Sequence, residues 1–327
     1  MSGAAPHPEA GGGAASTLEQ VCRAPAPDDT EIFPPNAWYG AARAVRAYSG
    51  WPAGRPLPLV LPHGVVLGAG AAWDYELRAR LPAVYSFPAF RDDAYAAGRP
   101  RVVPGCSPWL YHLATAHRAP QERDTVLLMP AHSSHHVTAD FDEERFLDDV
   151  RTRFDGRRIT CCMYWRDVEI GRHLLYRRNG IEVVSAGHML DPLFFRRLGE
   201  FFARAEVLVT NELGSHIFYA AAAGTPVRLM TGHASRWLGA AEIVARDVST
   251  AGRHERNEIA ACFDVDTPDL AQQQQMAHAM LGGERMQEPA ALRQLLEALW
   301  RTRGFRTTVV LPWRLRRSLR RLRRLRP

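Results

Sequence analysis

Glycine, serine and histidine gather at one strand-to-helix turn in the second half of the chain. The run EVLVTN at 206–211 has the apolar character of a buried parallel strand, and it ends at Asn211. Gly214, Ser215 and His216 then begin a helix of small residues. A helix start offers backbone N–H groups and the positive end of its dipole, and glycine lets a ligand approach the backbone closely. This turn predicts a phosphate-binding site, and simple helix capping is the competing interpretation.

A second polar cluster follows the first strand of the same predicted sheet. The strand at 125–131 leads directly to His132, Ser133 and Ser134, and two more histidines follow. Because parallel strands end at one edge of a sheet, we expect these side chains beside the 214–216 turn. We interpret them as donors to a phosphate or a sugar. A metal site is the weaker interpretation, because no other strong ligand cluster accompanies these histidines.

Two further histidines follow predicted strands and could exchange protons with a ligand. His188 comes directly after the strand at 181–186, so we expect it to face the same crevice as His132 and His216. His63 ends a short apolar run in the first half of the chain. A histidine placed opposite a nucleotide site suits a general base, since its unperturbed pKa lies near neutrality. A structural histidine in a turn is the competing interpretation for His63.

The elements that hold these residues alternate between strands and helices from about 125 to 230. Four or five strand–helix units in succession predict a parallel sheet with Rossmann-like winding. Shorter apolar runs at 56–68 and 81–88, and a strand, turn and helix at 99–118, predict a smaller unit before it. The polar stretch at 118–124 is the expected boundary. The predicted fold class is therefore α/β, with two Rossmann-like domains that face a cleft.

The charge of the chain is concentrated in its last residues. The chain has 327 residues and a net charge of +6, and all 41 basic residues are arginine. Positions 301–327 hold 11 arginines and no acidic residue, which leaves a net charge of −5 on the rest. In the same segment five leucines fall on one helical stripe. This pattern predicts a basic amphipathic helix that binds an anionic membrane surface, with a solvated or RNA-binding tail as the alternative.

Composition also limits the compartment and the partners. The chain without its last 27 residues is acidic, which argues against specific nucleic-acid binding by the whole protein. The number of cysteines is five, which is odd, and they lack a CxxC spacing, so free thiols in a reducing cytosol are expected. No apolar run reaches the roughly 18–20 residues of a membrane span. We predict a cytoplasmic protein that is held peripherally on the inner face of the membrane by its tail.

Several common catalytic motifs do not occur in the sequence. It contains no GxGxxG fingerprint, no GxxxxGK[ST] loop, no GxSxG elbow and no convincing metal motif. The absence of these motifs argues against a dehydrogenase, a P-loop kinase and an α/β-hydrolase. We expect neither a bound cofactor nor a metal.

A family resemblance appears when these features are taken together. The His63-Gly64 pair, the GCSPWLY turn at 105–111, the Rossmann-like second half and the run TNELGSHIFYAAAAGTPV at 210–227 resemble the GT-B glycosyltransferases. The likeness is to bacterial enzymes of capsule, lipopolysaccharide and teichoic-acid assembly, including the CDP-glycerol glycerophosphotransferases. Many of these enzymes place an acidic residue late in the second domain, on the ribose. Here it has no obvious counterpart, and Glu212 comes too early.

The composition predicts a disordered leader at 1–28 and a basic tail at 305–327. The resemblance implies that 29–120 is an acceptor-side domain and 121–304 a nucleotide-donor domain. The candidate catalytic residues are His63, as the base, and His188. The candidate donor-binding residues are His132, Ser133, Ser134, Asn211, Gly214, Ser215 and His216.

The implied activity is transfer of a sugar or polyol phosphate from a nucleotide-activated donor to a glycan or lipid-linked acceptor at the cell surface. Two alternatives stay open. One is a nucleotide-sugar 2-epimerase of the same fold, and the other is a non-catalytic protein that binds a nucleotide or a glycan.

Overall fold

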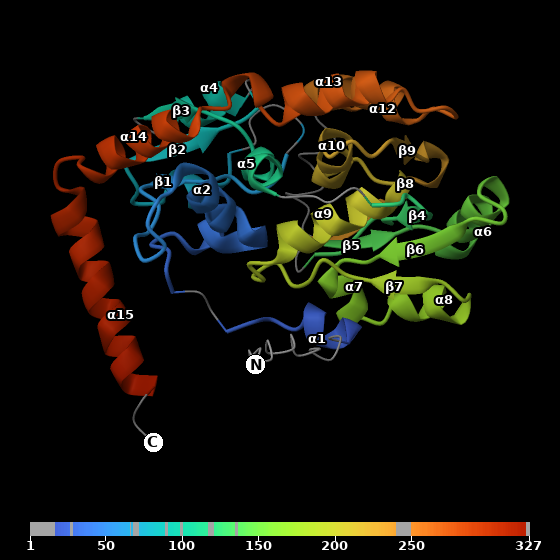
Figure 1. Ribbon diagram of the computed structural model, residues 1–327, viewed down its shortest axis with the longest axis horizontal. Helices are drawn as coiled ribbons and strands as arrows, with labels where there is room; N and C mark the ends of the chain where they lie inside the picture. Colours follow the sequence, from blue (N-terminus) through green and yellow to red (C-terminus); the bar gives the residue numbers. More distant parts are fainter. Residues whose placement is uncertain are drawn as a thin grey trace, which may run out of the picture.

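The computed structural model describes residues 17–26, 29–65, 67, 72–88, 91–98, 101–116, 121–134, 137–239 and 250–324. Within the last range, side chains are described from 256 to 319. Figure 1 shows two α/β halves side by side, with helix α15 (Leu311–Arg324) standing out from the first half.

The first half is built on a small parallel sheet. Its elements are α2 (Ala41–Ser49), β1 (Leu59–Val60), α3 (Asp74–Leu77), β2 (Ala83–Ser86), α4 (Asp92–Ala96), β3 (Val102–Pro104) and α5 (Pro108–Thr115). The strands lie in the order β1-β2-β3, each parallel to the next. A helix follows every strand, which is the repeating unit of a Rossmann-like fold. The run predicted as a strand at 56–68 pairs over two residues only.

The second half contains a five-stranded parallel sheet. Its strands are β4 (Thr125–Leu128), β6 (Arg158–Cys162), β7 (Glu182–Val184), β8 (Ala205–Thr210) and β9 (Val227–Leu229). The spatial order is β7-β6-β4-β8-β9, so the direction of winding reverses between β4 and β8. All four residues of β4 are buried, as expected for a strand covered on both faces. Ligands of such sheets bind beyond the strand ends at this reversal.

Helices connect and flank the strands of this sheet, and most of them fall where the sequence predicts a helix. They are α6 (Glu143–Arg153), α7 (Trp165–Glu169), α8 (His173–Arg178), α9 (Phe194–Arg204), α10 (Ser215–Ala222), α12 (Thr250–Phe263) and α13 (Leu270–Met280). Asp142 caps α6 by accepting from the N–H of Arg145 at 3.0 Å. The helix predicted at 168–180 is two helices, because Gly171 between them has a φ of 85°.

Two features of the second half lack a signal in the sequence. The first is an antiparallel ribbon of β5 (Val137–Asp140) and β10 (Arg236–Gly239), and the second is helix α12. The ribbon is largely exposed, so its residues show no alternation of apolar and polar side chains.

The N-terminal segment is more ordered than the predicted leader at 1–28. Of that range the structure describes 17–26, and there it forms helix α1 (Leu18–Cys22) with a capping box between Thr17 and Gln20. Leu18 and Cys22 are buried in the apolar core of the second half. The expectation of disorder is therefore wrong for this short helix, whose apolar surface is covered by packing. The rest of the predicted leader, 1–16 and 27–28, lies outside the described residues.

The two halves share a continuous core. Trp109 of α5 is fully buried, stacks on the ring of Tyr219 in α10 and donates its indole N–H to the Tyr219 carbonyl at 3.0 Å. The chain also returns to the first half after α13. The N–H of Ser107 donates to Leu281 O at 2.8 Å, and helix α14 (Pro289–Trp300) packs on α2. The parallel sheets with their flanking helices confirm the predicted α/β class with two Rossmann-like halves.

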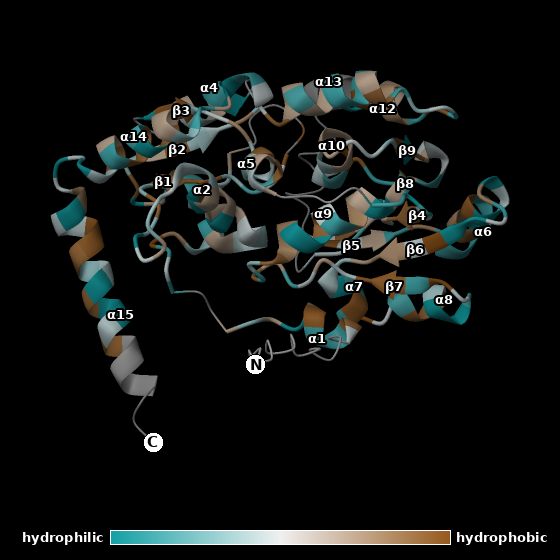
Figure 2. Ribbon diagram, viewed as in Figure 1, coloured by the Kyte–Doolittle hydropathy of each residue, from teal (hydrophilic) through white to brown (hydrophobic). Residues whose placement is uncertain are grey.

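The C-terminal helix α15 exposes both leucines and arginines. Leu311, Leu315 and Leu319 are 53%, 59% and 58% exposed. Figure 2 shows hydrophilic and hydrophobic residues alternating along this helix. Near its middle, Arg317 forms an ion pair with Asp29 at 2.9 Å. Within the described ranges, no helix combines the length and the apolar character needed to cross a bilayer.

Candidate functional site

A cavity of about 350 Å³ opens between the halves, at the reversal point of the larger sheet. Val65 and Leu67 line it from the first half, and His132 lines it from the loop after β4. The turn after β8, up to the start of α10, supplies further lining residues. The remaining lining residues are Asn211, Glu212, Leu213, Gly214, Ser215, Leu229, Thr231, Ala234, Ser235, Trp237 and Arg256.

His132 is held by a carboxylate within this cavity. Its Nδ1 lies 3.0 Å from Oε2 of Glu212, and its backbone N–H donates to the same oxygen at 3.2 Å. Burial disfavours the imidazolium, but the Glu212 carboxylate outweighs that effect and raises the pKa of His132. Burial likewise opposes ionisation of Glu212, yet the attraction of His132 prevails and lowers the pKa of Glu212. The pair therefore favours an imidazolium beside a carboxylate.

The start of α10 joins the two halves. Ser215 Oγ accepts the backbone N–H of Val65 at 2.7 Å, across the cleft. A Cβ at Gly214 would lie 2.9 Å from Nδ1 of His216, so only glycine fits the turn without a shift of that ring. Helix geometry leaves the N–H groups of this first turn without intrahelical acceptors. The structure thus brings the predicted phosphate-binding turn to the wall of a cavity.

His216 lies beneath this turn rather than in the cavity. Its ring is buried, and Nε2 lies 3.0 Å from the hydroxyl of Thr210, which also accepts the N–H of Glu212 at 3.2 Å. Burial lowers the pKa of His216 to about 4, so its ring is neutral at pH 7. The contacts show a histidine that fixes the turn, and its predicted role as a donor to phosphate stays a prediction.

The amide of Asn211 ties the ends of strands together. Its Oδ1 accepts the N–H of Ala131 at 2.8 Å, and its Nδ2 donates to the carbonyl of His233 at 2.8 Å. Both functional groups of the amide are thereby occupied by backbone. Asn211 lines the cavity and shapes it, and binding of a donor by its side chain is not tested.

Ser133 and Ser134 shape the loop that carries His132. The N–H of Ser133 donates to the Asp167 carboxylate at 3.1 Å, and its hydroxyl accepts the N–H of Ala139 at 3.2 Å. Ser134 Oγ accepts from Val137 at 3.3 Å. Neither serine lines the cavity, so their predicted contact with a donor also stays a prediction.

His63 lies two residues before Val65 in the chain, and it is not itself a lining residue of the cavity. Its Nδ1 is 2.8 Å from the Tyr75 hydroxyl, and its ring packs edge-on against Trp38 with the centroids 4.8 Å apart. Trp73 stacks on the same histidine. His63 thus lies in an aromatic cluster of the first half, and its role as a base stays a prediction.

His188 does not line the cavity. It is buried, its Nδ1 accepts the N–H of Leu190 at 3.1 Å, and burial lowers its pKa. A series of ring contacts runs from His132 through Tyr164 and Trp165 to His188. Two aromatic rings therefore separate His188 from the crevice that we expected it to face.

The polar and aromatic lining residues Glu212, Trp237 and Arg256 are among those absent from the predicted site. Glu212 follows directly after Asn211 and could have been found as a carboxylate at the same strand end. Trp237 and Arg256 come from β10 and α12, the two elements that the sequence pattern did not predict.

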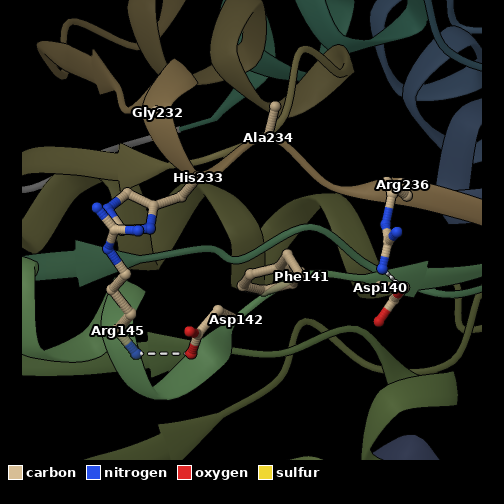
Figure 3. Close-up of a pocket in the computed structure, with 8 residues that line it drawn as sticks. All are labelled: Asp140, Phe141, Asp142, Arg145, Gly232, His233, Ala234 and Arg236. Atoms are coloured by element: carbon tan, nitrogen blue, oxygen red, sulfur yellow. Dashed lines mark hydrogen bonds and ion pairs between the residues drawn. The ribbon is translucent and has the colours of Figure 1, made fainter.

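A second cavity, of about 450 Å³, lies on the other side of the 231–236 segment. Figure 3 shows Asp140 and Arg236 directed at each other, and the backbone N–H of Arg145 donating to Asp142. Arg236 pairs with Asp140 at 2.7 Å, and His233 pairs with Asp149 at 2.7 Å. No predicted site residue lines this cavity, so we place the candidate site in the cleft.

Comparison with known proteins gives structural likeness only. No protein-family model matches the chain, and neither does any curated protein sequence. A UDP-GlcNAc 2-epimerase from Neisseria meningitidis, bound to UDP-GlcNAc, has 9% identity and a TM-score of 0.36 over 80% of each chain. The wall teichoic acid polymerase TagF has 13% identity and a TM-score of 0.39 over 74% of this chain and 67% of its own. S. aureus MnaA with UDP has 11% identity and a TM-score of 0.35 over 82% and 81%.

Proposed function

We propose that the chain is a transferase that moves a sugar or polyol phosphate from a nucleotide-activated donor to a glycan or lipid-linked acceptor. The observation that carries the proposal is the cleft cavity. It lies at the reversal point of a parallel sheet, has a helix start on its wall and takes residues from both halves. A site lined by two halves suits a reaction between two substrates.

The second half supplies the features that favour an anionic donor. The first turn of α10 presents N–H groups and a dipole end at Gly214 and Ser215. His132, in its imidazolium form, and Arg256 add positive charge to the lining. These groups would hold the diphosphate of the donor and stabilise the leaving group. That group is the nucleoside diphosphate when a sugar is transferred and the nucleoside monophosphate when a polyol phosphate is transferred.

The acceptor would enter from the first half. His63 would remove the proton of an acceptor hydroxyl, whose oxygen then attacks the anomeric carbon or the phosphorus of the donor. The aromatic cluster around His63 would shield this step from water. Neither a metal nor a cofactor is part of the proposed reaction.

The tail would place the protein on a membrane. Segment 301–327 carries 11 arginines without an acid, and the described part of α15 exposes three leucines. An amphipathic helix of this composition binds anionic lipid by burying its apolar side and pairing its charges with headgroups. Such a location, on the inner face of the membrane, suits an acceptor that is linked to lipid.

A 2-epimerase of nucleotide sugars is the second candidate. It is favoured by the His132–Glu212 pair, because an acid–base pair beside a bound donor could act without an acceptor. Turnover of a nucleotide sugar in the absence of an acceptor would support the epimerase, and turnover only with an acceptor would support the transferase.

Thermal stabilisation by nucleotides tests the donor site. UDP, CDP, GDP, CMP and ADP are added to the full chain, and we expect at least one diphosphate to raise Tm through preferential binding to the folded state. Arg256→Gln should weaken this shift. Arg145→Gln is the matched control, because Arg145 lines the second cavity and should leave the shift unchanged. If none of these nucleotides raises Tm, the proposal is contradicted.

A further inference from the structure

We infer that His132 and Glu212 form a proton-transfer pair in the cleft, in which Glu212 positions the ring and, during transfer of a sugar, His132 gives its proton to the departing diphosphate. The inference rests on the proposed function and deepens it by assigning the group that assists the leaving oxygen. In these terms His132 is a catalytic residue and Glu212 is a positioning residue.

Contacts on two sides fix the orientation of the His132 ring. Glu212 Oε2 accepts at 3.0 Å from Nδ1 and at 3.2 Å from the backbone N–H of the same residue. The Tyr164 ring lies edge-on to the imidazole at a centroid distance of 4.7 Å, and its hydroxyl is 3.0 Å from that of Tyr39 in the first half. A hydrogen bond from Nδ1 to a carboxylate leaves Nε2 as the atom that can meet a ligand.

The side chain of His132 is more exposed than that of Glu212, as expected if His132 contacts the ligand and Glu212 positions that histidine. The His132 side chain is 39% exposed and lines the cavity, whereas that of Glu212 is 13% exposed. The imidazole can therefore reach a bound ligand while its carboxylate partner is shielded from solvent. Shielding strengthens the electrostatic attraction within the pair.

The charged groups around His132 agree with a ring that carries a proton. Burial opposes the charge, but the nearby carboxylates outweigh it and raise the pKa of His132. His216, on the other side of Glu212, is neutral at pH 7 because burial lowers its pKa to about 4. The surroundings thus favour a proton on His132 and disfavour one on His216. The titratable and charged groups that face His132 or share its cavity are Glu212, Asp167, Arg172, Tyr164, His216 and Arg256.

The step balances in protons and electrons. The bond between the transferred group and the diphosphate oxygen breaks, and its electron pair stays on that oxygen. The proton on Nε2 of His132 passes to the same oxygen, which leaves a neutral ring. The acceptor oxygen forms the new bond and gives its proton to His63. His63 then releases its proton to water, and His132 takes up a proton from water. Both histidines return to their starting states.

Titration of His132 by NMR tests the pair directly. In the free full-length protein we expect Glu212→Gln to lower the pKa of His132 by about one unit or more, because the amide keeps a hydrogen bond but removes the charge. Asp149→Asn is the matched control. It neutralises the carboxylate beside His233, at 2.7 Å, and should leave the His132 titration unchanged. An unchanged pKa of His132 in Glu212→Gln would overturn the inference.

Addition of UDP to the unmodified chain provides a second measurement that needs no variant. If His132 contacts the diphosphate, UDP raises the pKa of His132 further, and UDP affinity falls about tenfold for each pH unit above that pKa. Binding of UDP without a change in the His132 titration would overturn the inference while leaving the donor site intact. Failure of the chain to bind any nucleotide would contradict the proposed function instead, and the titration of Glu212→Gln would still report on the pair.

Discussion

Each half of the molecule places a histidine shortly after its first strand, and the two histidines have different partners. His63 follows β1 and shares Nδ1 with the hydroxyl of Tyr75 at 2.8 Å. His132 follows β4, and its Nδ1 lies 3.0 Å from the Glu212 carboxylate. Burial raises the pKa of Tyr75, so its phenol is neutral at pH 7 and gives an imidazolium less support than a carboxylate does. These partners agree with the proposed mechanism, in which His63 takes a proton in the first half and His132 gives one in the second.

The two histidines can act on one reaction only if the halves are fixed to each other. Of the changes considered, truncation of Trp109, at the contact between the halves, has the largest expected effect. Truncation of this fully buried ring removes its packing on Tyr219 and its indole hydrogen bond. We expect Trp109→Ala to lower the free energy of unfolding by about 4 kcal/mol, measured by chemical denaturation. Leu174→Ala, at an exposed position, should change it by less than about 0.5 kcal/mol. A loss below about 1 kcal/mol for Trp109→Ala would show that the halves do not depend on this contact.

The next largest effect is the loss of folding stability at acid pH that arises from His216, beneath the turn after β8. His216 has a folded pKa of about 4 and an unfolded pKa near 6.5, so the unfolded chain binds more protons between these values. Stability from this group is present above pH 6.5 and is lost as the pH falls toward 4, to a total of about 3 kcal/mol. His216→Asn should flatten that part of the stability–pH curve. An equal slope in both proteins would mean that His216 is not neutral in the folded state.

Replacement of each histidine sharpens the comparison between the halves. His132→Gln should weaken UDP binding about tenfold or more at pH 7, since a charged hydrogen bond to the diphosphate is lost. His63→Gln should leave UDP affinity within about twofold, because the proposed mechanism has His63 act on the acceptor. Isothermal titration calorimetry measures both. If the two variants weaken UDP binding equally, the assignment of donor and acceptor to different halves is wrong.

Removal of the tail has the smallest expected effect on the cleft. Deletion of 311–327 should abolish binding to phosphatidylglycerol vesicles and leave UDP affinity unchanged, because no described residue of α15 lines the cavity. Binding by the full chain should weaken as salt is added, since lipid headgroups and arginines attract electrostatically. Vesicle co-sedimentation that survives the deletion would contradict the membrane role of α15.

Much of the second half could be predicted from the sequence, because its central strand β4 is buried throughout and helices α6 and α13 begin at capping aspartates. The strand ends that carry His132 and Asn211 follow from that pattern. It does not show which side chains turn toward the ligand. Ser133, Asn211 and His216 have the chemistry of ligand donors but make their hydrogen bonds within the fold, and Glu212 was passed over.

The features that the sequence missed depend on contacts between distant segments. Helix α1 is short, and the burial of Leu18 and Cys22 depends on packing against the second half. The β5–β10 ribbon is exposed and pairs segments about 100 residues apart, so no local periodicity marks it. Trp237 and Arg256 reach the cavity from β10 and α12 and were missed for the same reason.

The central claim is that a nucleotide diphosphate binds in the cleft at the start of α10. Backbone amide NMR of the full chain during titration with UDP tests it most directly. The account predicts saturable shifts at Gly214 and Ser215, with a matching shift at His132. Shifts confined to the second cavity, around Arg145 and His233, or no saturable shift with UDP, CDP or GDP, would contradict it.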